Sequence, residues 1–351
     1  HIQTVRELDA EMTDLKLSTN ATTKELKDFY YSSAETAKQL GTSTQEIMSQ
    51  TNKWARLGYS IKEASALAKN AVILNSISPG LDMDDAAESL SAALQSFRLD
   101  ADDALDGIIS KINVIGHSGL INNSGIADIL NSTSAAMSEA NNTLEETIAL
   151  SAAASQATPD TGLIGDTLNA LAKNIQDKGS IISKLTETRS SPGGISPFTD
   201  VDNDTLRSTY QILSDIASVW NDMDTANREQ LISSLAAGES GDVLSSIITN
   251  FDTARNSMTL MAGSAGSAMQ SMDAVYDGLD FKLNRLSETG TGIAQNLFGG
   301  SEMKTVVDGI NAVGNAVEWV TGKLGLLGTS GAISGLLMNR AGIGERTIIQ
   351  W

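Results

Sequence analysis

One stretch, from Thr205 to Gly238, constrains the fold more than any other, because its pattern fits two helices joined by a short turn. Apolar side chains recur at steps of 4, 3, 4 and 3 residues through Leu206, Tyr210, Leu213, Ala217 and Trp220. This spacing lays one apolar stripe along a helix. Residues 221–224, three of which are Asn or Asp, interrupt the stripe, and Asp224 is predicted to cap a second helix that ends at Gly238. We therefore predict a helical hairpin with Trp220 buried at its elbow and a packing corner formed by Leu206, Tyr210, Leu213, Trp220, Leu231 and Leu235.

The composition of the whole chain favours the same kind of structure. Apolar residues make up 41% of the 351 residues, but aromatic residues only 4%, which suits closely packed helices better than an aromatic-rich β core. Only four prolines interrupt the chain. No stretch alternates apolar and polar residues for long enough to predict a strand. The predicted fold class is all-α.

Charge and cysteine content exclude several kinds of function. The formal net charge is −19, and a surface this acidic repels phosphate backbones, so we expect no specific nucleic-acid binding. The chain has no cysteine, which excludes disulfides, zinc–thiolate sites and a cysteine nucleophile. No cofactor is predicted. The chain begins at His1 and not at Met, so we expect a processed chain or a piece of a longer one.

Residues 1–40 carry the most regular periodicity. Steps of 3 and 4 residues alternate through Val5, Leu8, Met12, Leu15, Thr19, Thr22, Leu26 and Phe29. This is the seam of a coiled coil, although one amphipathic helix packed on a domain gives the same pattern. Both readings predict a single helical stub over 1–40, and the seam residues are Val5, Leu8, Met12, Leu15, Leu26 and Phe29.

The remainder of the chain divides into further helical units at Gly, Pro and Asn clusters. Helices are predicted at 44–57, 60–76, 83–97, 101–115, 125–139, 143–156 and 161–176, which form a first helical core at 41–178. A loop or linker at 179–204 contains Pro192 and Pro197. A second core at 205–298 holds the hairpin and long helices at 243–261 and 265–297. An apolar, Gly-rich, helical segment at 299–351 ends the chain.

Few residues are suited to chemistry. A zinc site needs three or four ligands, whereas His1 and His117 are the only histidines, and His117 lies in a Gly/Asn-rich link typical of a turn. Asp200, Asp202 and Asp204 alternate as calcium ligands do, but the Gly and Glu of a calcium loop are absent from the expected positions. The preferred interpretation is a polar loop in which Asp204 caps the next helix. We expect no catalytic residue and no resident metal.

The segment 324–339 carries no charged residue and includes Gly331 and Gly335 in a GxxxG arrangement. At 16 residues it is shorter than the roughly 20 that span a bilayer. Two readings stay open: a helix that inserts into a host membrane, or one that packs against sister copies or a hub. Gly331, Gly335, Leu336 and Leu337 are the predicted contact residues in both. Before it, residues 306–320 carry valine and isoleucine at steps of 4, 3, 4 and 3, which predicts a packing face.

The order of these units resembles the conserved core of phage tail tape measure proteins, over about Gly41 to Phe298. Five stretches carry the resemblance: LGTSTQEIMSQTNKWARLGYSIKEASALAKNAVILNSIS (40–78), LDMDDAAESLSAALQSFRLDADDALDGIISKIN (81–113), LEETIALSAAASQATPDTGLIGDTLNALAKNI (144–175), the hairpin at 205–238, and AGSAGSAMQSMDAVYDGLDFKLNRL (262–286). Each is only a capped amphipathic helix or pair of helices, and their shared order is the specific feature.

The resemblance implies a structural role in a tailed phage or a phage-tail-like bacteriocin. Such proteins lie in the lumen of the tail tube, set its length during assembly, and leave ahead of the DNA. The implied partners are sister copies, as a trimer or hexamer, the tail tube, the tail-tip or baseplate hub, and the host membrane on ejection. A helix of 351 residues would span only about 500 Å, so we expect the core of a longer ruler. The alternatives are a membrane pore formed by 302–340 and a peptidoglycan hydrolase.

Overall fold

The computed structural model describes residues 2–198, 206–236, 238–278, 281–282, 284–285 and 288, with only the backbone described for 2–5. The first half of the described chain contains seven α-helices. They are α1 (Ile2–Thr19), α2 (Thr23–Leu40), α3 (Thr44–Arg56), α4 (Ile61–Ser76), α5 (Met83–Ser96), α6 (Ser110–Gly116) and α7 (Asn123–Glu139).

The second half contains eight more. They are α8 (Leu144–Ala154), α9 (Thr161–Asp177), α10 (Gly179–Leu185), α11 (Thr209–Val219), α12 (Thr225–Leu235), α13 (Glu239–Thr249), α14 (Phe251–Ala262) and α15 (Ser267–Asp277). Within the described residues the only β-type pairing is one isolated bridge between Phe198 and Leu206. The predicted all-α fold class is therefore confirmed.

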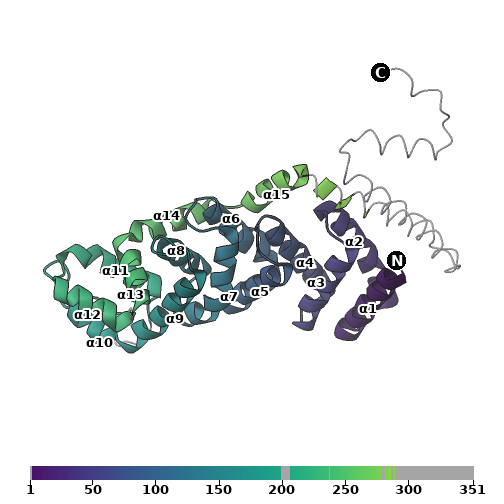
Figure 1. Cartoon of the computed structure of the whole chain (residues 1–351). Helices are drawn as coiled ribbons and strands as arrows, with labels where there is room; N and C mark the ends of the chain where they lie inside the picture. Colours follow the sequence, from purple (N-terminus) through teal and green to yellow (C-terminus); the bar gives the residue numbers. More distant parts are fainter. Residues whose placement is uncertain are drawn as a thin grey trace, which may run out of the picture.

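The helices form an elongated body along which the chain runs out and then returns (Figure 1). On the outward path α3 packs on α4, α4 on α5, α5 on α7, and α7 on α9, with α1 and α2 laid against α3. Helices α10 and α12 form the far end. The return path runs through α13, which packs on α9, and α14, which packs on α8. It reaches α15, which packs on α6 and α4.

Helix α8 is the centre of the body. Of its eleven residues every one except Glu145 is buried. Six helices surround it: α6, α7, α9, α11, α13 and α14. A helix that is buried around its whole circumference depends on neighbouring helices on every side. The alanine-rich sequence of α8 lets these neighbours approach closely. Its two buried hydroxyls, on Thr147 and Ser151, donate to the carbonyls four residues earlier at 2.9 and 2.8 Å.

Polar side chains on α6 and on the segment directly before it fix the start of α15. The Asn113 amide donates to the Ser267 hydroxyl and carbonyl at 2.6 and 3.0 Å, and the Asp106 carboxylate accepts from the Gly266 amide at 2.9 Å. Beyond α15, the Phe281 ring lies so close to Gly41 that a Cβ on Gly41 would be 2.4 Å from it. Gly41 also has φ = +67°, which glycine adopts without strain. The end of the return path is thereby attached to the turn between α2 and α3.

Residues 1–40 form two helices and not the single helix predicted from their periodicity. The break lies at Asn20, which is left-handed with φ = +54°. Thr22 starts α2 through a capping box, in which its hydroxyl accepts from the Glu25 amide and the Glu25 carboxylate accepts from the Thr22 amide. The T-x-x-E sequence starts a new helix although the apolar spacing continues through it. The capping box gives hydrogen-bond partners to two amides that the start of a helix would otherwise leave without them.

Four other predicted elements differ from the structure. The helix at 101–115 begins as a 3-10 turn (Ala101–Asp103) and a π-helical segment (Ala104–Ile109) before α6. The loop predicted at 179–204 contains α10, which buries Ile182 and Leu185. The long helices predicted at 243–261 and 265–297 are each interrupted: Asn250 separates α13 from α14, and α15 ends at Asp277 before the extended residue Gly278, after which the described residues 281–282, 284–285 and 288 are again helical. Short polar side chains and glycine favour such ends.

We predict that Leu150→Ala in α8 lowers the free energy of unfolding by about 2–5 kcal/mol, because it removes a fully buried side chain from a site enclosed on all sides. The matched control is Leu17→Ala on α1, where leucine is 76% exposed and the loss should stay within about 0.5 kcal/mol. Urea unfolding followed by circular dichroism measures both. Equal losses for the two variants would contradict the central position of α8.

Candidate functional site

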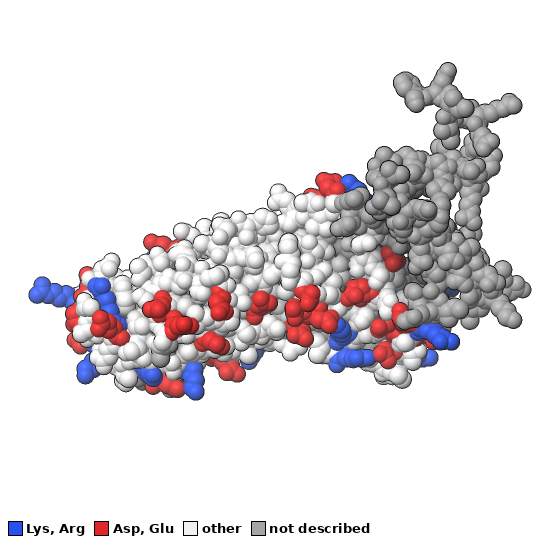
Figure 2. Space-filling view, in the orientation of Figure 1, with Lys and Arg blue, Asp and Glu red and all other residues white. Residues whose placement is uncertain are grey.

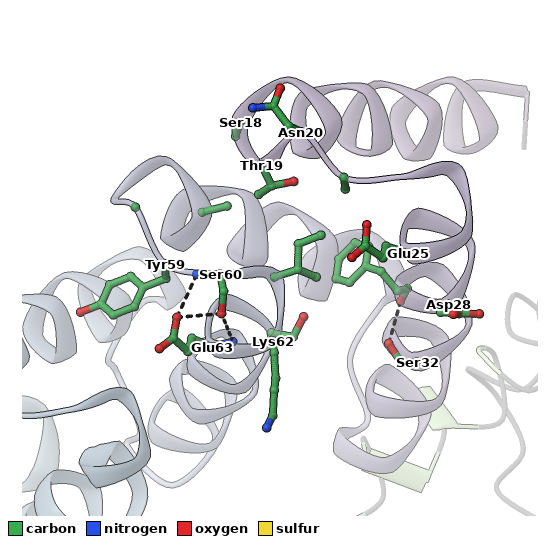
Figure 3. Close-up of a pocket in the computed structure, with 16 residues that line it drawn as sticks. Ser18, Thr19, Asn20, Glu25, Asp28, Ser32, Tyr59, Ser60, Lys62 and Glu63 are labelled. Carbon is green, nitrogen blue, oxygen red and sulfur yellow. Dashed lines mark hydrogen bonds between the residues drawn. The ribbon is translucent and has the colours of Figure 1, made fainter.

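An open cleft of about 1040 Å³ lies at the N-terminal end of the body. Figure 3 shows that it is formed by the end of α1, the exposed side of α2 and the turn that leads into α4. The side chains of Phe29, Ala55 and Ile61 give it a partly apolar floor. Its polar lining consists of Ser18, Thr19, Asn20, Glu25, Asp28, Ser32, Tyr59, Ser60, Lys62, Glu63 and Ser65.

Two of the cleft carboxylates belong to capping boxes at the starts of α2 and α4. The Thr22 amide and hydroxyl donate to Glu25 at 2.8 and 2.7 Å, and these bonds hold the pKa of the Glu25 carboxyl below its usual value. The Ser60 hydroxyl and amide donate to Glu63 at 2.7 and 2.9 Å and lower its pKa in the same way. Both carboxylates are therefore ionised at neutral pH.

This arrangement is suited to holding helix ends and accepting hydrogen bonds. A serine hydroxyl can act as a nucleophile when a base takes its proton. The Ser60 hydroxyl donates to the Glu63 carboxylate, but the lowered pKa of Glu63 makes this carboxylate a weak base. Asp28 adds a third carboxylate to the lining of the cleft, and Lys62 is its positively charged lining residue. The cleft therefore presents a negative, polar rim over a partly apolar floor.

A second polar cluster joins the starts of α8 and α11 inside the body. Glu146 accepts from the Thr143 amide at 3.0 Å and from the Ser208 hydroxyl, the N-cap of α11, at 3.1 Å. Asn142 accepts from the Tyr210 amide at 3.0 Å and donates to the Thr209 hydroxyl at 3.1 Å. Burial raises the pKa of Glu146, in spite of these hydrogen bonds. Sequence inspection missed this junction, although T-x-x-E at 143–146 and S-x-x-Q at 208–211 are its capping signals.

The predicted packing corner is only partly assembled as expected. Leu213, Leu231 and Leu235 are fully buried, but Tyr210 and Leu206 are half-buried, and Leu206 precedes α11. The core stripe of α11 consists of Thr209, Ile212, Leu213, Ile216 and Val219.

The prediction that Trp220 is buried is wrong. Its ring is half-buried in a 3-10 turn (Trp220–Asp222), and the Arg228 guanidinium lies 5.5 Å from the ring centroid. Val219 takes the inward position, because the buried stripe of α11 runs through Ile212, Ile216 and Val219, one residue before the predicted stripe. Asp224 caps α12 as predicted, accepting from the Asn227 amide at 2.8 Å.

The seam residues lie on two different helices. Leu8 and Leu15 of α1 are buried, as are Leu26 and Phe29 of α2, and Met12 is half-buried. The side chain of Val5 lies outside the described residues. Helix α1 directs this face at α3, where the Glu11 carbonyl accepts from the Asn52 amide at 2.8 Å. In this structure the seam is thus used inside one chain.

The remaining candidates give no assembled site. Asp200, Asp202 and Asp204 lie outside the described residues, as do Gly331, Gly335, Leu336, Leu337 and the whole segment 299–351. His117 is exposed, and its Nδ1 lies 2.8 Å from the Asn113 carbonyl oxygen. Across the described part of the chain, no three His, Cys, Asp or Glu side chains are grouped to hold a metal ion. No helix in that part is long and apolar enough to cross a membrane.

Charge is distributed unevenly along the body. Figure 2 shows Asp and Glu side chains following its length, while Lys and Arg gather toward its two ends. Residues 1–70 carry nine Lys and Arg and nine Asp and Glu, whereas residues 71–288 carry 11 and 30. The whole net charge of −19 therefore belongs to the part of the chain that follows α3 and most of α4.

These features define an elongated, all-helical protein whose acidic body is built around one buried helix. Comparison with known families gives a match to the family described as phage-related minor tail protein, over residues 34–238. The match covers more than half of the chain, so the chain belongs to this family and is a structural component of a phage tail. No solved structure matches it.

We predict that Glu146→Gln changes the pH dependence of stability in a direction set by the raised pKa. A carboxyl with a raised pKa holds its proton more tightly in the folded state, so its ionisation costs folding free energy as pH rises. Glutamine cannot ionise. The free energy of unfolding of the variant, relative to the unchanged protein, should therefore increase between pH 4 and pH 7 in urea titrations.

Glu63→Gln is the matched control with the opposite sign. The pKa of Glu63 is lowered, so its ionised form stabilises the folded state, and this contribution is lost as pH falls through the folded pKa. This variant should lose stability relative to the unchanged protein over the same rise in pH. A parallel response of the two variants would contradict the assignment of a buried, destabilised carboxylate at Glu146.

Proposed function

We propose that this chain is a tail tape measure protein, a helical ruler and plug that sets tail length during assembly and leaves the tail ahead of the DNA. The observation that carries the proposal is the match to the minor tail family over 34–238. The resemblance of the five stretches between residues 40 and 286 to the tape measure core supports the finer assignment.

The shape and surface of the body suit this role. The body is elongated and helical, as an axial component of a narrow tube must be (Figure 1). Its acidic surface repels the phosphate backbone of DNA that passes through the same tube. This repulsion favours release of the chain ahead of the DNA over binding of the chain to the DNA. We propose the lumen of the tail tube as its location. Sister copies arranged about the tail axis as a trimer or hexamer, the tube, and the tail-tip or baseplate hub would be its partners.

The test is a change of length. In the phage that encodes the chain, 70 residues of uninterrupted helical heptads inserted directly before His1 should lengthen the tail by about 105 Å, since a helix rises 1.5 Å per residue. Electron microscopy of purified particles measures the difference. The matched control is an insert of the same length interrupted by prolines, which should add less. Viable particles with unchanged tails would overturn the ruler role and leave a structural tail protein.

A second candidate function is a membrane pore formed by residues 302–340 on ejection. The charge-free sequence at 324–339 favours it. Dye release from liposomes by the full chain, lost when 302–340 is deleted, is the expected result. No release by the full chain would count against it.

We further propose that the chain has no catalytic role. The capping function of Glu25 and Glu63 supports this, since each is bonded to the start of a helix. Incubation with purified peptidoglycan should release no soluble fragments. Measurable cleavage by the full chain would instead support the hydrolase alternative.

A further inference from the structure

Two exposed leucines lie beside the cleft at the N-terminal end of the body. Leu17 on α1 is 76% exposed and Leu57 at the end of α3 is 54% exposed, the two highest values for large apolar side chains in the described part of the chain. Each directly precedes a residue of the cleft lining, Ser18 or Gly58. A small molecule that filled the cleft would leave both leucines in water, whereas a polypeptide segment lying across it can cover them.

The floor of the cleft adds apolar contact area that is already in place. Phe29 and Ala55 are buried beneath it, and Ile61 is half-buried. The helices that carry these side chains, α2, α3 and α4, pack on one another. A cleft formed by packed helices loses little conformational entropy when a ligand binds, so more of the contact energy appears as affinity.

Three carboxylates make the cleft a site for positive charge. Glu25 and Asp28 lie on the α2 side and Glu63 on the α4 side (Figure 3). Against them stands Lys62, so three negative charges and one positive charge leave the lining at −2. The capping bonds of Glu25 and Glu63 all go to Oε2, and Oε1 of each carboxylate can therefore accept from an incoming cation.

The starts of α2 and α4 also border the cleft, yet they do not suit an anion. A helix start attracts anions through amides that lack a partner. Here the Thr22 and Ser60 amides donate to the two capping carboxylates, and the Glu25 and Glu63 amides donate to the two hydroxyls. A phosphate would have to displace these bonds and lie against ionised carboxylates, so the cleft selects against it.

We propose that the cleft binds a basic, amphipathic segment of a partner protein. The Lys or Arg side chains of this segment pair with Glu25, Asp28 and Glu63. Its aliphatic side chains cover the apolar floor together with Leu17 and Leu57. One ligand thereby buries the exposed leucines and neutralises the carboxylates around them.

Charge indicates that this segment belongs to a different protein and not to a second copy of the chain. Residues 71–288 carry 11 Lys and Arg against 30 Asp and Glu, so another copy of the acidic body would be repelled. Residues 1–70 have nine of each sign and residues 289–351 have four of each, so neither range is basic. The inference goes beyond the proposed ruler, since it concerns the chemistry of a partner and does not depend on tail length.

A peptide of defined composition tests the charge of the site. The full-length protein is titrated into a fluorescein-labelled peptide that repeats Leu-Leu-Arg-Lys, and binding is followed by fluorescence anisotropy. Glu25→Gln with Asp28→Asn should weaken binding about tenfold, because two carboxylates are lost while glutamine still accepts the capping bonds. Asp28→Asn alone, which alters no cap, should give part of the loss. Equal binding of a peptide with Glu in place of Arg and Lys would overturn the proposal.

Glu88→Gln with Asp166→Asn is the matched control for charge. It removes the same two charges from exposed positions on α5 and α9, outside the cleft. The dissociation constant should change by less than about twofold, since scattered surface charges are screened by salt. An equal loss for both pairs of substitutions would mean that the whole acidic body attracts the peptide, and would overturn the cleft as the site. Circular dichroism establishes that each variant is folded.

Leu17→Ala with Leu57→Ala tests the apolar half of the site. The loss of both exposed side chains should weaken binding of the Leu-Leu-Arg-Lys peptide about fivefold, because less apolar surface is buried. Leu260→Ala, which changes an exposed leucine of α14 outside the cleft, should leave binding unchanged. Unchanged binding by the Leu17 and Leu57 variant would overturn the proposal, whereas the tail-length experiment would be unaffected.

Discussion

The burial of α8 is the constraint on which the rest of the fold depends. A helix whose circumference is enclosed on all sides requires neighbours from both the outward and the return path of the chain, and six helices supply them. Its polar groups are satisfied locally or by the junction at Glu146, so few groups are left to destabilise the core. The body is consequently one packed unit, in which short helices are stabilised by their contacts with one another.

The sequence was informative about where helices lie and less so about where they end. Positions marked by capping residues and glycines, such as Ser60, Gly41 and Asp224, agree with the structure within a residue or two. Two of the failures share one cause. At Asn20 and Asn250 an uninterrupted apolar repeat passes through a polar residue that ends a helix, and periodicity alone cannot detect this.

The sites were harder to predict than the fold, because they depend on pairs of residues distant in the chain. The Glu146–Ser208 bond joins residues 62 positions apart, and the Phe281–Gly41 contact joins two ends of the described chain. In the sequence alone, Glu146 and Ser208 each resemble an ordinary helix cap, and Phe281 resembles an isolated aromatic residue. The error at Trp220 is of a different kind: the buried stripe of α11 lies one residue before the predicted one and ends at Val219, so Trp220 falls in the following turn.

The return of the chain to its starting end has a mechanical consequence. Helix α1 and the residues around Phe281 and Glu288 all meet α2 and α3, so tension applied through the two flanking segments is transmitted to the same end of the body. Such a load acts first on the contacts of α1 with α3 and of α15 with α4 and α6, and it reaches α8 only through them. A chain drawn lengthwise through a narrow channel would therefore unravel from one end, at forces set by single helix contacts and not by the strength of the whole core.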